Sequence, residues 1–123
     1  MANPYALNVA FTSDNRLILT DAQGMTLYYL TNERASAPIC TGTCAAAWPP
    51  ALAGSAGAAG VAVDPALSPM AVVTDANGAQ LSYHGHLLYR YSKDTAPGQV
   101  NGDRVTDTWG TWAVATPDLP FWP

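Results

Sequence analysis

The sequence predicts an all-β domain with at most one short helix. Short runs of β-branched and aromatic residues alternate with clusters of Asp, Asn and Gly, which is typical of antiparallel hairpins. The phrase GMTLYYLTNE at residues 24–33 returns as GHLLYRYSKD at residues 85–94, so one structural unit is used twice. Helix-forming patterns are scarce. We therefore expect two pseudo-repeated, three-stranded antiparallel meanders plus a C-terminal strand, packed as a sandwich or a partly closed barrel.

The turns between the apolar runs define the individual strands. In the turns DAQG and DANG, the Asp side chain opens the turn and the Gly supplies a positive φ where one is needed. The dipeptide HG fits a two-residue type I′ turn with Gly in the second place. These signals give strands at 5–11, 16–20 and 25–31 in the first meander, strands at 70–74, 79–83 and 86–92 in the second, and a seventh strand at 108–116.

The remaining segments complete a single domain over residues 1–123. The run CAAAW at residues 44–48 is the one helix candidate, and it ends at two prolines because proline cannot continue a helix. The chain then divides into pseudo-repeat 1 at 5–50, an Ala/Gly/Pro-rich loop at 51–69, pseudo-repeat 2 at 70–117 and a tail at 118–123.

Two tyrosines take matching places in the repeated phrase. Because side chains alternate along a strand, Tyr28 and Tyr89 face the same way as Leu30 and Tyr91, which lie two residues further on. We interpret them as inward-facing core aromatics whose hydroxyls find a partner. The alternative is that they form part of an exposed binding surface.

Composition excludes several classes of partner. The formal net charge is −4 and charged residues make up 11% of the chain, with no basic stripe for nucleic acid or polybasic stretch for anionic lipid. No apolar run is long enough to span a membrane. The first residues lack the basic start and long apolar stretch of a signal peptide, so the chain is either cytosolic or a mature form.

The two cysteines help to choose the compartment. Cys40 and Cys44 lie in the Gly/Thr loop CTGTC, with no third or fourth soft ligand nearby, which favours a disulfide and an oxidising compartment. A reactive dithiol and a metal-binding pair are the alternatives. Closing so short a loop gains only about 2 kcal/mol, so such a bridge would shape the loop rather than hold the fold.

With these motifs in place, the chain resembles the secreted repeat family of unknown function, described as predicted lipoproteins with the motif Y-x-(F/W/Y)-x-x-D. YRYSKD fits this motif with Tyr89, Tyr91 and Asp94. YYLTNE, which begins at Tyr28, departs from it, because a Leu takes the aromatic place and Glu33 replaces the Asp. The resemblance implies export to the periplasm, the cell surface or the medium, and often a lipid anchor, although no lipid-attachment cysteine is visible.

Two groups of residues are candidates for metal chemistry. His84 and His86 lie across a tight turn, and Met25 or Met70 would add a soft ligand, a combination that suits copper. The alternatives are that the histidines are ordinary turn and strand residues, or that they have another pH-dependent role. A Gly-rich loop gathers oxygen ligands for calcium, although turn caps explain them equally well; these are Asp94, Asn101, Asp103 and Asp107.

No catalytic motif is present in the sequence: there is no nucleophile elbow and no phosphate-binding loop. The Trp and Tyr residues would offer a flat surface for sugars or a partner if they were exposed. We therefore expect an exported cell-envelope β module that is not an enzyme and that binds an envelope protein or a small ligand. The alternative is a copper- or haem-associated accessory protein of extracytoplasmic electron transfer.

Overall fold

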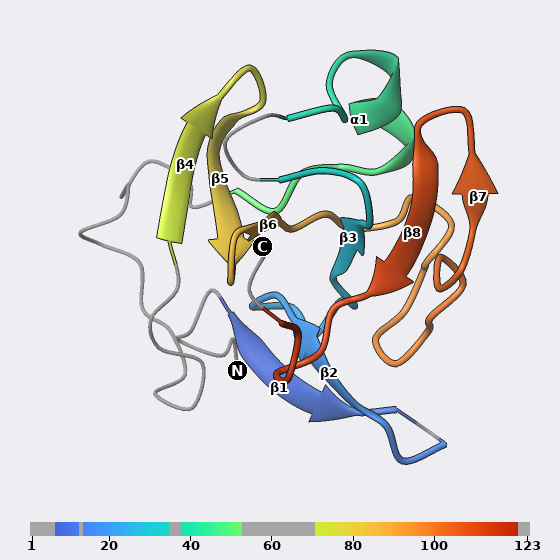
Figure 1. Cartoon of the computed structure of the whole chain (residues 1–123). Coiled ribbons are helices and arrows are strands. Elements are labelled where there is room, and N and C mark those ends of the chain that lie inside the picture. Colours follow the sequence, from blue (N-terminus) through green and yellow to red (C-terminus); the bar gives the residue numbers. More distant parts are fainter. Residues whose placement is uncertain (1–6, 13, 35–37, 53–70, 121–123) are drawn as a thin grey trace.

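The predicted all-β architecture with one short helix is confirmed (Figure 1). The structure is a computed structural model that describes residues 7–12, 14–34, 38–52 and 71–120. Within these ranges the strands form three small antiparallel sheets, and none of them closes into a barrel. The elements in chain order are β1 (Asn8–Phe11), β2 (Leu17–Thr20), β3 (Tyr28–Leu30), α1 (Thr43–Ala47), β4 (Ala71–Asp75), β5 (Gly78–Tyr83), β6 (His86–Leu87), β7 (Thr106–Asp107) and β8 (Gly110–Val114).

The second meander is present as the sheet β4–β5–β6. Its first turn is held by the Asp75 carboxylate, which accepts the Asn77 N–H at 2.8 Å, and Gly78 has a φ of +110°. The second turn has positive φ at both His84 and Gly85, as a type I′ turn requires. The local turn chemistry of the sequence is therefore enough to build this sheet.

The first meander is not formed as predicted. β1 and β2 make the expected hairpin, but β3 pairs with β8 instead of extending that sheet, with Tyr28 opposite Val114 and Leu30 opposite Trp112. A single bridge, between Thr20 and Thr26, still links the second and third segments. This arrangement lets β8 bring a buried Trp and Val against the buried residues of β3, an apolar contact that the β1–β2 hairpin does not offer.

The C-terminal strand also differs from its predicted extent. Regular pairing covers Gly110–Val114 rather than 108–116, because the preceding residues form the turn of a hairpin with β7, a strand that we did not predict. The third strand of the second meander is regular only at His86–Leu87. Beyond it, the backbone bonds leave the sheet: Tyr89 pairs with Tyr28, and the Arg90 N–H donates to the Pro49 carbonyl at 2.7 Å.

The core draws on both pseudo-repeats. One cluster of buried apolar residues includes Leu19 and Leu27 from the first pseudo-repeat with Leu81 and Leu88 from the second. A second cluster combines the buried tyrosines of β3 and of the segment after β6 with two tryptophans and the disulfide. Our predictions for residues 5–6, for most of the 51–69 loop, for Met70 and for the last three residues lie outside the described residues.

Candidate functional site

The two equivalent tyrosines meet where the pseudo-repeats cross. Tyr28 and Tyr89 pair antiparallel, each backbone N–H donating to the other's carbonyl at 2.7 and 2.9 Å. Both residues are 0% exposed, so they belong to the core and not to an exposed aromatic surface. This pairing fixes the two copies of the repeated phrase about a local twofold.

The tyrosine hydroxyls bind the acidic residues of the opposite copy. The Tyr28 hydroxyl donates to Asp94 Oδ2 at 2.5 Å, and the Tyr89 hydroxyl donates to Glu33 Oε2 at 2.9 Å. Each motif therefore supplies a tyrosine to the other motif's carboxylate. We call these two interactions the crossed pairs; they join residues 66 and 56 positions apart in the chain.

Each carboxylate of the crossed pairs also holds backbone. Glu33 Oε2 accepts the N–H groups of Ile39 and Cys40 at 2.5 and 2.8 Å. Asp94 Oδ1 accepts the Asn101 N–H at 3.1 Å, and the Tyr28 hydroxyl accepts the N–H of Gly102 at 3.2 Å. The acidic position of the motif thus positions the chain that follows it, including the start of the disulfide loop.

Burial keeps these groups in their neutral forms. Desolvation, followed by the hydrogen bond to Asp94, raises the pKa of Tyr28, and desolvation followed by the charge of Glu33 raises the pKa of Tyr89. Desolvation also raises the pKa of Glu33, because it outweighs the donors that favour the ionised carboxylate, and the charge of Asp75 adds to it. The tyrosines are accordingly hydrogen-bond donors and not nucleophiles.

A stack of aromatic rings packs beside the crossed pairs. Trp48 lies between Tyr91 and Trp112, with centroid distances of 4.0 Å on both sides and interplanar angles of 19° and 7°. Both indole N–H groups donate to Asp107 Oδ2 at 3.0 Å. A Cβ at Gly102 would lie 2.7 Å from the Trp48 ring, so only glycine fits there. Our sequence reasoning missed this arrangement, although the CAAAWPP block was its one visible signal.

The aromatic-surface hypothesis is wrong for two of the tryptophans. Trp48 and Trp112 are 1% and 0% exposed, so neither offers a face to a sugar or a partner. Trp109 is half-buried, and Trp122 lies outside the described residues.

The predicted disulfide is confirmed. Cys40 and Cys44 are joined, their Cα atoms are 5.0 Å apart, and both are fully buried. The bridge closes the loop that leads into α1 and packs in the same cluster as Trp48. The cysteines are therefore structural, and the dithiol and metal-pair alternatives are excluded in this oxidised form.

The two histidines bind the C-terminal segment. His84 Nδ1 lies 2.5 Å from the Leu119 carbonyl oxygen, and His86 Nε2 lies 2.9 Å from that of Pro120. The Tyr83 hydroxyl donates to the Pro117 carbonyl at 2.6 Å, so three successive contacts hold this segment against the turn. Burial lowers the pKa of His86, and the bond to Pro120 only partly offsets it. This attachment was not visible in the sequence.

The proposed metal ligands have structural partners. Within the described ranges, no group of three or more His, Cys, Asp and Glu side chains could hold a metal ion. Met25 is buried, and its N–H and carbonyl are both bound to Asp21. The copper or haem alternative therefore stays a prediction that nothing described here favours.

The calcium candidates are likewise engaged, but in different places. Asp94 belongs to a crossed pair, and Asp103 accepts Arg16 Nη1 at 3.1 Å and the Val114 N–H at 3.0 Å. Asp107 holds the two indoles, and Asn101 is exposed and bound to the Lys93 carbonyl. Calcium binding also stays a prediction.

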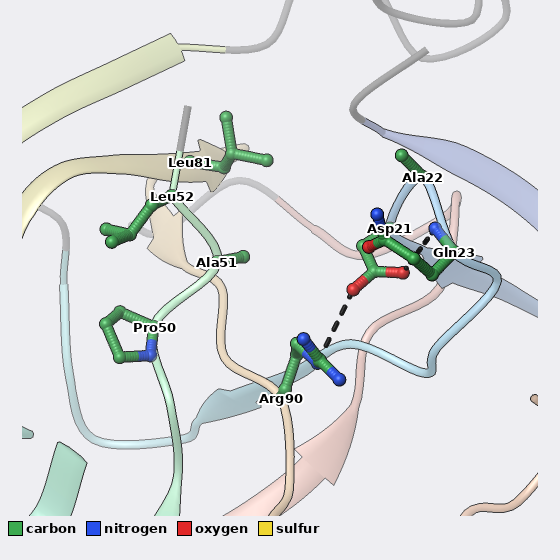
Figure 2. Close-up of a pocket in the computed structure, with 8 residues that line it drawn as sticks. All are labelled: Asp21, Ala22, Gln23, Pro50, Ala51, Leu52, Leu81 and Arg90. Atoms are coloured by element: carbon green, nitrogen blue, oxygen red, sulfur yellow. Dashed lines mark hydrogen bonds and ion pairs between the residues drawn. The ribbon is translucent and has the colours of Figure 1, made fainter. Parts of the chain in front are cut away.

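An open pocket remains on the surface between the two pseudo-repeats. It has a volume of about 320 Å³ and is lined by Asp21, Ala22, Gln23, Pro50, Ala51, Leu52, Leu81 and Arg90. Figure 2 shows Pro50 and Leu52 on one side of this space and Asp21 on the other, with Arg90 joined to Asp21 by an ion pair of 3.4 Å. We call it the Arg90 pocket. Our sequence reasoning missed it, because its lining comes from three separate segments.

Comparison with known proteins places the second pseudo-repeat in a family. Residues 71–116, from β4 to just beyond β8, match a family described as a secreted repeat of unknown function. No curated protein and no solved structure matches the chain. No helix in the described part of the chain is long and apolar enough to cross a membrane. A family of secreted repeats indicates an extracytoplasmic location, in keeping with the disulfide. Residues 71–116 of this chain are therefore a secreted repeat of unknown function.

Proposed function

We propose that the protein is a non-catalytic binding module of the cell envelope, and that the Arg90 pocket holds a small ligand with a carboxylate beside an apolar group. The observation that carries this proposal is a half-exposed guanidinium next to an apolar wall. The role of such a module would be to retain or present its ligand outside the cytoplasm.

Arg90 is held in position for an anion. Its Nε faces Asp21 Oδ2 at 3.4 Å, and its side chain is 43% exposed. Asp21 is itself fixed, because its Oδ1 accepts the N–H groups of Gln23 and Met25, both at 2.9 Å. None of the described residues bonds to the two terminal nitrogens of Arg90, which therefore present N–H donors suited to two carboxylate oxygens.

The opposite wall supplies apolar contact. Leu52 is 48% exposed although it lies beside the buried Ala51 and Leu81. An aliphatic group placed against Leu52 and Pro50 would be withdrawn from water while its carboxylate reaches Arg90. The volume of about 320 Å³ is at the lower end of small-molecule sites. One guanidinium beside a carboxylate, with a small wall, supports a weak site with a dissociation constant of about 1 mM.

The positions of the perturbed titratable groups support a binding role over catalysis. Active sites usually gather groups with shifted pKa values in a cleft. Here the pKa of Glu33 and of His86 is shifted by burial at places away from the pocket, where both side chains are bonded to backbone or to a tyrosine. The pocket lining includes neither of them.

The test is an NMR titration of the ¹⁵N-labelled protein with hexanoate, and with hexanol and hexylamine as probes that share its chain. We expect saturable shifts only with hexanoate, centred on the backbone amides of Asp21, Leu52 and Arg90. Arg90→Gln should weaken binding about tenfold, which corresponds to one charge-assisted hydrogen bond. Lys93→Gln, which removes a positive charge from an exposed site, is the matched control and should leave binding unchanged. Equal shifts with hexanol, or unchanged affinity in Arg90→Gln, would refute the proposal.

A further inference from the structure

The outer edge of β1 has backbone groups without partners. Thr12 N–H donates to the Arg16 carbonyl at 2.8 Å, which makes Thr12 and Arg16 a hydrogen-bonded pair of the β1–β2 ladder. In an antiparallel ladder such pairs alternate, so the backbone groups of Val9 and Phe11 point away from β2. None of the described residues receives or supplies a backbone bond there.

This edge lacks the features that normally block strand pairing. Residues 7–12 contain no charged residue and no proline, whereas exposed edges are usually guarded by Lys, Pro or a bulge. The register from Asn8–Thr20 to Phe11–Leu17 runs without a bulge. An uncharged, regular edge is a template for another strand.

The end of the hairpin exposes apolar side chains. Phe11 and Leu17 lie directly opposite one another and are 65% and 38% exposed. They share a face with Val9 and Leu19, which pack against the core. Figure 1 shows the far end of the β1–β2 hairpin standing clear of the other two sheets, so its core-facing side continues past the core.

We propose that β1 pairs antiparallel with β1 of a second copy of this chain, about a twofold axis at Ala10. Val9 and Phe11 are equidistant from Ala10, so the axis sets Val9 of one protomer opposite Phe11 of the other, twice. Each such pair exchanges both N–H···O bonds, because these are the residues whose backbone groups point outward. The result is a four-stranded sheet in which two hairpins share one face.

A second copy fits this edge better than an unrelated segment. The arrangement is self-complementary: the residue that meets its own counterpart is the small, uncharged Ala10, so no like charges are opposed. Opposite residues share a face, so Phe11 becomes covered by its own Leu17 and by the partner's Val9. Strands this short bury less than the ~1,000 Å² typical of stable complexes, so the dimer forms in a concentration-dependent way.

The test is sedimentation equilibrium of the full chain from about 10 µM to about 1 mM. We expect dimerisation in this range, with the amides of Val9 and Phe11 exchanging more slowly as concentration rises. Phe11→Lys should weaken dimerisation at least about tenfold by adding like charges close to the axis. The control Ile39→Lys changes a residue that is also 38% exposed but lies away from β1, and it should dimerise like the unmodified chain.

Three results would overturn the inference. The first is a chain that stays monomeric to about 1 mM, whether or not another protein binds it. The second is a dimer that Phe11→Lys leaves intact. The third is a dimer in which exchange at Val9 and Phe11 does not change with concentration.

Discussion

Removing the tyrosine hydroxyls one at a time tests whether the crossed pairs hold the two pseudo-repeats together. Tyr89→Phe deletes the donor to Glu33 Oε2, which keeps its two backbone donors. Because hydrogen bonds to charged acceptors contribute about 1.5–3 kcal/mol, we expect a loss of about 2 kcal/mol. Tyr28→Phe also leaves the buried Gly102 N–H without its acceptor, so we expect about 3 kcal/mol. Truncation of either tyrosine to Ala should cost about 3–5 kcal/mol.

The crossing itself is measured by double-mutant cycles with Glu33→Gln and Asp94→Asn. Tyr28 should couple to Asp94, and Tyr89 to Glu33, by about 1 kcal/mol, because each of these pairs shares a hydrogen bond. The pairs within one motif share no such bond, and their effects should add to within about 0.5 kcal/mol.

The assay is urea unfolding at neutral pH with the disulfide intact, followed by tryptophan fluorescence and circular dichroism. Tyr29→Phe is a matched control, because Tyr29 adjoins Tyr28 but is half-buried and its hydroxyl has no partner among the described residues; it should change stability by less than about 0.5 kcal/mol. A loss under about 1 kcal/mol for Ala at both core tyrosines, or stronger coupling within a motif than across motifs, would refute the reasoning.

Three further predictions follow from the buried groups. Gly102→Ala should cost about 1–3 kcal/mol by urea unfolding and reduce the near-UV dichroism of the tryptophan stack, because its Cβ would strike Trp48; an unchanged spectrum would contradict this. Since burial raises the pKa of Glu33, its folded form holds a proton more tightly, so the stability of the natural chain relative to Glu33→Gln should fall as pH rises above about 4.5; a rising difference would reverse the sign. His84→Ala should cost about 1 kcal/mol through its lost bond to the Leu119 carbonyl, and any saturable Cu(II) binding should vanish in the double variant with His86→Ala; metal binding that survives there excludes both histidines.

The sequence carried the local features of this fold. The Asp75 and His84–Gly85 turns follow from the conformations that Asp, Gly and a two-residue hairpin loop favour, and the second meander was found on that basis. The disulfide followed from two cysteines in a short Gly/Thr loop. In each case the interacting residues lie within a few positions of one another.

Contacts between distant segments could not be read in the same way. Nothing local to β3 specifies that it pairs with β8, since that choice depends on where two tryptophans are buried together. Asp107 looked like an oxygen ligand in a turn-rich loop, yet it binds two indoles from opposite ends of the chain. The motif spacing likewise placed each tyrosine five residues before an acid, but the partner of each is the acid of the other copy.

The nuclear Overhauser contacts of the two buried tyrosine hydroxyl protons test the central claim most directly. Their bonding should slow exchange with water enough for detection at low temperature. We predict contacts from the Tyr28 hydroxyl to the amides of Asn101 and Gly102, and from the Tyr89 hydroxyl to the amide of Cys40, because each tyrosine donates to the carboxylate that holds those amides. Contacts from the Tyr28 hydroxyl to Cys40 instead would show that each motif satisfies its own acid, and would contradict the crossed arrangement.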